Sequence, residues 1–309
     1  MRRAWFVIKS SRGGAVVLAL LVFALVGPSV TQNIFTTAGR PGVARHHHTA
    51  PLLLNGKVLV VGGEDGAGNV LSSAELYDPA TRTWKETGRL AESRKDHTAG
   101  LVPDGRVVVI GGYHRGELAS AELFDPATET WAGAGRMTRS RIQHTTSLLP
   151  NGNVMVAGGP AGPASVEVYD PSRGTWTSTG SFITGRREHA AVRFFNNTVL
   201  VVGGRAAQGA GLLASAELYD PATGRWSGRG SLKTARAGHV ATLLGTAKVL
   251  VTGGSDGDGP LASAELYDPA TGLWTETGSM STARSRHTVK LLPTGQVLAA
   301  GGRGPDGEI

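Results

Sequence analysis

Residues 94–136 read RKDHTAGLVPDGRVVVIGGYHRGELASAELFDPATETWAGAGR, and their landmarks return at regular intervals along the chain. The stretch opens with an Arg-x-x-His motif, Arg94 to His97, and a β-branched run leads to the pair Gly111-Gly112. Copies of the motif follow one another every 45 to 50 residues, and the equivalent histidines are His48, His97, His144, His189, His239 and His287. A fixed period of this size indicates a repeat architecture.

One copy predicts four short strands, which we denote a to d. Strand a covers 97–102, strand b covers 107–110, strand c covers 119–125, and strand d contains Trp131. Asp104-Gly105 between a and b is typical of a tight hairpin, because both central residues must accept positive φ. The uninterrupted β-branched run of strand b is expected in a strand buried on both faces. Strand c alternates and places Glu122 opposite its apolar neighbours. Asp-Pro then makes the c–d turn.

The other copies repeat this chemistry, and no helical period occurs after residue 32. Four antiparallel strands per unit, repeated without helices, predict an all-β fold of the β-propeller type. We expect six blades of four strands, and a seventh remains open. Phe35 lies as far before His48 as Trp84 lies before His97, so residues 33–38 resemble an orphan strand d. The last copy gives only strands a and b before Ile309. We therefore expect an incomplete last blade, which about a dozen further residues would complete.

The residues themselves resemble a known family. A glycine pair closing a hydrophobic strand, then Glu-x-Tyr-Asp-Pro and a tryptophan, is similar to the kelch repeat of bacterial secreted kelch proteins and of the central domain of galactose-oxidising copper enzymes. The resemblance covers residues 33–309 in five full copies. It implies a kelch-type propeller with strand a innermost and strand d outermost. The copper enzyme's cysteine–tyrosine crosslink is excluded, because the chain has no cysteine.

The N-terminal residues 1–31 predict a signal peptide or membrane anchor, and residues 32–309 form the propeller domain. Basic residues precede an apolar run at 15–27, which is the layout of a secretory signal. That run is shorter than the ~20 residues of a spanning helix, which favours cleavage, although a retained anchor stays open. Either alternative places the repeats outside the cytoplasm, as a secreted, periplasmic or cell-surface protein.

Charge and composition narrow the function. The formal net charge of +7 falls to +3 when the four basic residues of 1–31 are left out, an excess too small to indicate nucleic-acid binding. The absence of cysteine excludes disulfides, thiolate catalysis and cysteine metal ligands. Neither a cofactor nor a metal is predicted, and the adjacent His46, His47 and His48 are interpreted as a chance cluster. We expect a monomer.

The connections between the predicted strands indicate where a ligand binds. The a–b and c–d turns are uniform and lie on one face of a propeller, whereas the b–c loops and d–a links vary and lie on the other. A varied loop face carried by a regular scaffold is where binding is built. The candidate ligand-binding residues on it are Tyr113, His114, Arg115, Arg205 and Asp256.

The Arg-x-x-His motif has two interpretations. Its arginines could ring the channel mouth and hold a carboxylate or acidic sugar. Alternatively, each arginine pairs with a strand-c glutamate and each histidine bonds backbone between blades. We favour the second, because a structural device is needed once per blade. Arg94, His97, Gly111, Gly112, Glu122 and Trp131 are then structural positions. The tryptophans are expected to pack between blades, although an indole N–H at the rim could also bind sugar.

Two functions remain. No serine-hydrolase, zinc-protease, nucleotide-binding or sialidase motif occurs. We therefore expect a non-enzymatic, extracytoplasmic scaffold that binds an unidentified protein or carbohydrate through its loop face. The alternative is a small enzyme similar to the kelch-type epimerases of sialic acid. An enzyme needs one blade that departs from its siblings.

Overall fold

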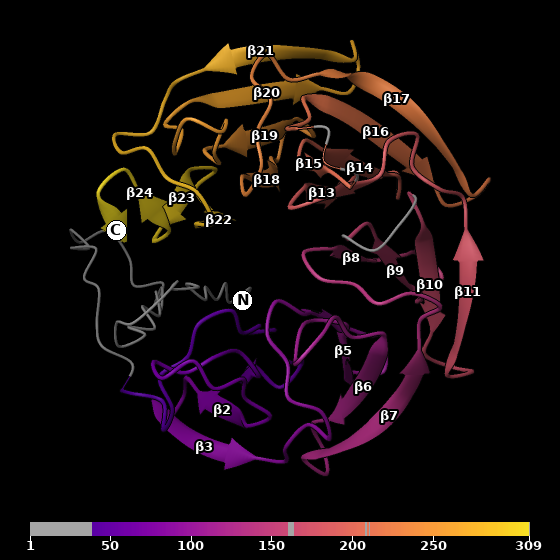
Figure 1. Cartoon of the computed structure of the whole chain (residues 1–309), viewed down its shortest axis with the longest axis vertical. Helices are drawn as coiled ribbons and strands as arrows, with labels where there is room; N and C mark the ends of the chain where they lie inside the picture. Colours follow the sequence, from indigo (N-terminus) through magenta and orange to yellow (C-terminus); the bar gives the residue numbers. More distant parts are fainter. Residues whose placement is uncertain (1–38, 160–163, 208, 210, 309) are drawn as a thin grey trace.

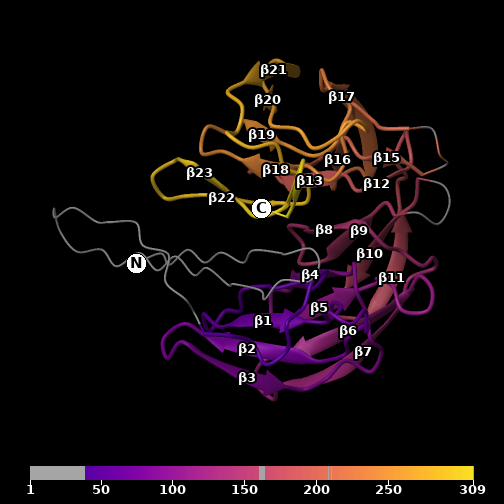
Figure 2. The same cartoon turned by 60° about the vertical axis from the view of Figure 1, so that its left-hand side comes forward.

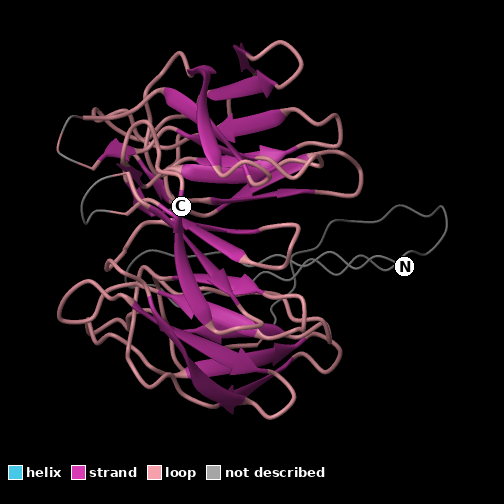
Figure 3. Cartoon of the chain, turned by 90° about the vertical axis from the view of Figure 1, so that its right-hand side faces the viewer, coloured by secondary structure: helices cyan, strands magenta, loops and turns pink. Residues whose placement is uncertain are grey.

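The computed structural model describes residues 39–159, 164–207, 209 and 211–308. These residues form strands, turns and loops, and Figure 3 shows the strands and loops of the chain coloured separately. Within these ranges, no helix is long and apolar enough to cross a membrane. The predicted signal or anchor at 1–31 and the orphan strand at 33–38 lie outside the described residues.

Four blades are complete four-stranded antiparallel sheets. Blade 2 contains β4 (Thr98–Leu101), β5 (Val107–Ile110), β6 (Ser120–Asp125) and β7 (Thr130–Arg136). Blade 3 contains β8 (Thr145–Leu148), β9 (Val154–Ala157), β10 (Val166–Asp170) and β11 (Thr175–Thr179). Blade 4 contains β13 (Ala190–Arg193), β14 (Val199–Val202), β16 (Ser215–Asp220) and β17 (Arg225–Ser231). Blade 5 contains β18 (Val240–Leu243), β19 (Val249–Thr252), β20 (Ala264–Asp268) and β21 (Leu273–Thr277). The four strands predicted per copy are thus confirmed for these four copies.

Blade 1 is a three-stranded sheet of β1 (Val58–Val61), β2 (Ala74–Asp78) and β3 (Thr83–Thr87). Its predicted innermost strand is reduced to two isolated bridges, which join Thr49 to Val61 and Leu52 to Val58. Pro51 lies between them and accepts a bond from Leu59 N at 3.0 Å but has no N–H to return. A proline therefore removes one ladder bond and interrupts the strand.

Blade 6 consists of β22 (Thr288–Leu291) paired with β23 (Val297–Ala300). The residues that follow form a short hairpin of β24 (Arg303–Gly304) and β25 (Gly307–Glu308). Blade 4 also has a small extra pair in its loop region, formed by β12 (Arg186–Arg187) and β15 (Arg205–Ala206). These short pairs lie on the loop face, where the sequence varies most.

The blades follow one another around a common axis (Figure 1), and Figure 2 shows them from a second direction. Contacts between successive blades run through the innermost strands, from β4 to β8, β13, β18 and β22. The chain is therefore a radial β-propeller and not a linear stack, as the repeat predicted. In Figure 1 the described residues leave the circle open between the yellow blade 6 and the indigo blade 1.

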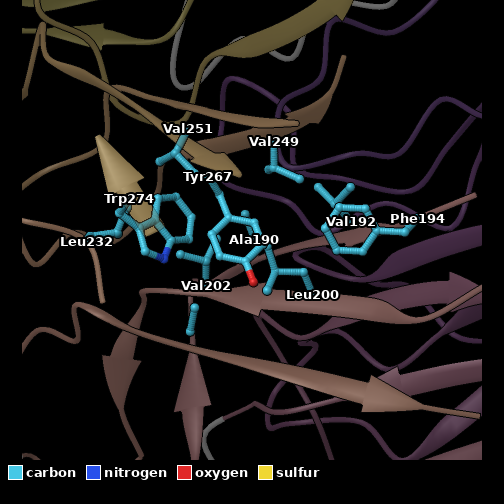
Figure 4. Close-up of a cluster of buried hydrophobic side chains, with 11 residues drawn as sticks. Ala190, Val192, Phe194, Leu200, Val202, Leu232, Val249, Val251, Tyr267 and Trp274 are labelled. Atoms are coloured by element: carbon cyan, nitrogen blue, oxygen red, sulfur yellow. The ribbon is translucent and has the colours of Figure 1, made fainter. Parts of the chain in front are cut away.

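The hydrophobic core lies between the blades. Figure 4 shows the cluster between blades 4 and 5, in which Val202 and Leu200 of one sheet face Tyr267 and Val251 of the next. The indole N–H of each tryptophan in four blades donates to a carbonyl of the preceding blade, for example Trp176 to Ala134 O at 2.8 Å. Those indoles join blades, as expected, and their N–H groups are used there, which argues against the alternative of sugar binding.

Candidate ligand site at the mouth of the central channel

Five of the six motif arginines are buried structural groups. Arg94 is fully buried, and its guanidinium donates to Glu122 Oε1 at 2.8 Å and to the carbonyl of Gly111 at 2.8 Å. Five blades repeat this ion pair, with the partners Arg45–Glu75, Arg94–Glu122, Arg141–Glu167, Arg186–Glu217 and Arg236–Glu265. A buried arginine that has lost contact with water needs such a partner. The alternative that these arginines bind a ligand at the channel mouth was therefore wrong.

The repeat histidines are buried as well. The structure shows a strand-a threonine hydroxyl of the preceding blade as a partner of three of these rings, and backbone of the preceding blade also interacts with the ring, Ile110 with His144 and Val202 with His239. His144 Nε2 lies 2.7 Å from Thr98 Oγ1, and His189 Nε2 lies 2.9 Å from Thr145 Oγ1. Burial, reinforced by the charge of the neighbouring Arg141, lowers the pKa of His144 to about 3. Such a ring stays neutral at physiological pH and serves as a joint between blades.

The residue before each histidine forms a ring of its own. All six members have positive φ, between 52° and 64°, and they are His47, Asp96, Gln143, Glu188, Gly238 and Arg286. A left-handed backbone is costly for side chains other than glycine, so the fold holds five residues in a conformation they do not prefer. Backbone bonds connect neighbouring members: Glu188 N donates to Gln143 O at 3.0 Å, and Arg286 N donates to Gly238 O at 2.7 Å. The fold thus fixes one side chain per blade at the channel mouth.

This ring surrounds a cavity of about 280 Å³, which the buried histidines line from below. The acids and bases of the ring pair with one another. His47 Nδ1 lies 2.7 Å from Asp96 Oδ1, and Arg286 Nη2 lies 3.2 Å from Glu188 Oε1. The ring of mouth residues therefore carries both signs of charge, which provides polar groups to orient a partner.

A second cavity of about 580 Å³ adjoins the first and shares His47, Glu188, Gly238 and Arg286 with it. Most of its other walls come from the b–c loops, including Arg205 of blade 4 and Arg303 of blade 6. Residues of the d–a links and of the b–c loops therefore line one continuous hollow. This confirms that both sets of connections lie on the same face of the propeller.

Of the five predicted binding residues, Arg205 lines this hollow. Tyr113 is 39% exposed and packs under the Lys95 ammonium, 5.9 Å from its ring centre. Arg115 holds a turn position with φ 55°, and its neighbour His114 is half-buried in the same loop. Asp256 caps its own loop, since its Oδ1 accepts from the N–H groups of Asp258 and Gly259. These four residues lie outside the linings of both cavities.

The adjacent histidines also have separate partners. His46 Nε2 lies 3.2 Å from Glu64 Oε2, His47 pairs with Asp96, and His48 is buried in register with the other repeat histidines. They do not converge on one point. His47 is a mouth residue because it precedes the repeat histidine, not because it belongs to a cluster.

The mouth residues could have been found from the sequence, because they occupy a variable position inside the repeated Arg-x-x-His motif. Arg and His are constant in Arg-x-x-His, and the position before His holds a different residue in every copy. The position after Arg varies in the same way, and positions that vary between constant neighbours are not needed to hold the blades together. That six such residues meet around one hollow depends on the closure of the ring, which the motif alone does not show.

Comparison with known families identifies the repeat. The kelch motif matches residues 45–90, 95–138, 186–232 and 235–281, which correspond to blades 1, 2, 4 and 5. No curated protein matches the chain. Because the motif matches cover more than half of the chain and fall on radially arranged antiparallel blades, the chain belongs to the kelch-repeat family of β-propellers.

Proposed function

We propose that the protein is an extracytoplasmic, non-enzymatic binding propeller that holds a protein or glycan partner on its loop face, at the channel mouth. One observation carries this proposal: equivalent backbone positions around the mouth carry six different residues. The arginines and glutamates beneath them are repeated in five blades because each blade needs them. Recognition of a specific partner instead needs groups that differ from blade to blade and are held in fixed positions.

The extracytoplasmic location is supported by the sequence of residues 1–31, with its basic start and short apolar run. The kelch architecture supports the role of an interaction scaffold, because a rigid ring of sheets presents loops at fixed spacing.

A glycan array probed with the purified full chain tests the proposal. We expect a defined set of glycans to bind and Gln143→Lys to abolish this binding, because residue 143 lines the mouth. Lysine is tolerated there, since Arg286 places a long cation at the equivalent position with nearly the same φ. The control Asn151→Lys alters the exposed a–b turn of the same blade, at the opposite face, and should leave the array unchanged. Equal binding by both variants would contradict the proposed surface.

A second candidate is turnover of an acidic sugar. The observation that favours it is the departure of blades from one another at the mouth, where Asp96 and Glu188 provide carboxylates and Arg286 a cation. General acid–base chemistry needs such groups near the substrate. Incubating each array ligand with the protein and following product by mass spectrometry distinguishes the candidates, since conversion of a bound glycan identifies an enzyme.

A further inference from the structure

Blade 5 departs from the other blades at the mouth. Three equivalent positions shape each blade there: the residue after the motif arginine, the residue before the histidine and the residue after the glycine pair. In blade 5 all three are small, namely Ala237, Gly238 and Ser255. The same positions in blades 1, 2 and 4 hold large polar residues, namely His46, His47, Glu64, Lys95, Asp96, Tyr113, Arg187, Glu188 and Arg205. The 580 Å³ cavity lies over this gap, because small side chains leave the space empty.

Arginines flank the gap from both neighbouring blades. Glu188 is at the centre of the wall, with a side chain only 15% exposed, and both of its carboxylate oxygens are used. Its Oε2 accepts from Arg205 Nε of blade 4 at 3.2 Å, and its Oε1 accepts from Arg286 Nη2 of blade 6 at 3.2 Å. One buried carboxylate thus holds two guanidinium groups that come from residues 81 positions apart in the chain.

The two arginines keep donors for a ligand. Their side chains are 40% and 50% exposed, and within the described part of the chain each makes a single side-chain hydrogen bond, to Glu188. A guanidinium has five N–H donors in a planar fork that matches a carboxylate. Arg303 adds a third cation at the rim.

The charge of the cavity and the residues that line it indicate the class of ligand that it binds. Glu188 cancels one of the two charges it holds, and Arg303 adds another cation at the rim, so the lining attracts an anion, and the planar guanidinium forks match a carboxylate. The floor contributes the hydroxyl groups of Ser255 and Ser285. A hollow of this volume is within the roughly 300–1,000 Å³ of small-molecule sites. We infer that the cavity over blade 5 binds a small hydroxylated carboxylate through Arg205 and Arg286. This inference rests on the proposed function, because it names the ligand class of the same face.

Titration calorimetry of the full chain against matched probes tests this inference. The acids are glucuronate, galacturonate and gluconate, the neutral counterparts are glucose, galactose and sorbitol, and inorganic phosphate is the dianion. We expect at least one acid to bind about tenfold or more tightly than its neutral counterpart, because a charged hydrogen bond is lost with the carboxylate. Binding should weaken as salt is added, since the arginines are partly exposed.

Variants that copy residues of sibling blades locate the site without challenging the fold. Arg286→Gln copies Gln143, which has the same left-handed backbone, and should weaken acid binding about tenfold. Ser255→Tyr copies Tyr113 at the equivalent position of blade 2 and should abolish binding by filling the hollow. Arg173→Gln is the control, because it removes a cation that is 79% exposed on the c–d turns. It should bind as the parent does, and thermal melting should show that all three variants remain folded.

Three outcomes would overturn the inference. The acids bind no better than their neutral counterparts, phosphate binds more tightly than every acid, or Ser255→Tyr leaves acid binding unchanged. A glycan-array partner that is lost with Gln143→Lys but kept with Ser255→Tyr and Arg286→Gln would leave the binding propeller standing and reject this cavity. Conversely, conversion of a bound acid would reject the non-enzymatic function and leave the carboxylate site intact.

Discussion

At the scale of the residue, His239 shows what a repeat position requires. The blade-2, blade-3 and blade-4 histidines each contact a threonine of the preceding blade, and Thr98 and Thr145 are two of these partners. The position that would serve His239 is occupied by Ala190. Burial, with the charge of Arg236 acting in the same direction, lowers the pKa of His239 to about 3, so its ring is neutral, and its buried ring nitrogens lack the threonine partner of those other rings.

We expect Ala190→Thr to stabilise the protein by about 1 kcal/mol, because the new hydroxyl satisfies a buried ring nitrogen. Denaturant unfolding at pH 7.5 measures the change. Ala191→Thr is a matched control, since residue 191 points to the other face of the strand and Thr146 occupies the equivalent position in blade 3. An unchanged or lower unfolding midpoint for Ala190→Thr, relative to this control, contradicts the interpretation of His239 as an under-satisfied joint.

At the scale of the element, the glycine pair after each second strand brings the backbone of one blade into contact with the next blade. Gly111 has φ 62°, and a Cβ there would meet Arg141 O at 2.5 Å and His144 Cε1 at 2.9 Å in blade 3. Gly112 N donates to the same carbonyl at 2.8 Å. The backbone of one sheet therefore touches the motif of the next, and only glycine permits this approach.

Gly111→Ala should destabilise the fold by roughly 2 kcal/mol or more, because the methyl group collides with backbone and the left-handed φ is strained. Gly116→Ala lies in the b–c loop of the same blade, where a Cβ meets nothing within 4 Å, and should cost less than about 0.5 kcal/mol. Chemical denaturation of the two variants checks the difference. Similar unfolding midpoints for the two variants would show that the contact between blades adjusts to the added methyl group.

At the scale of the whole molecule, the buried histidines make stability depend on pH. Burial lowers the pKa of His144 and His239 to about 3 and that of His287 to about 4, with a nearby arginine adding to the effect in each case. The unfolded chain binds these protons near the ordinary pKa of 6.5, well before the folded chain does. Stability is therefore complete above pH 6.5 and is lost as the pH falls from 6.5 toward 3 to 4.

Lowering the pH from 7.5 to 5.5 should reduce the free energy of unfolding by about 1 kcal/mol for each of these three histidines. Urea unfolding at the two pH values measures the total, to which His189 also contributes because burial lowers its pKa well below the ordinary value. His239→Asn should show a smaller pH dependence than the parent chain. A midpoint that is the same at both pH values would mean that the rings are protonated in the folded state.

Much of the fold could be predicted because the information is local and repeated six times. The run Val107–Ile110 predicted β5 to the residue, and the glutamate of strand c was correctly paired with the motif arginine. The first blade was mispredicted at one point, because Pro51 interrupts a strand that the repeat register alone would complete. The binding residues such as Tyr113 and Asp256 were chosen from loop composition, and the structure places four of the five outside the linings of both cavities.

The sequence by itself determined the blades, their turns, their buried ion pairs and the aromatic joints, because each depends on spacing within one repeat or between adjacent repeats. Only the tertiary structure decided where a ligand can bind. Glu188, Arg205 and Arg286 meet because the ring places blades 4 and 6 on either side of the small residues of blade 5. Periodicity describes what the blades share, whereas a binding site arises from the residues that differ between them. Those residues form a site only when the blades are arranged around one axis.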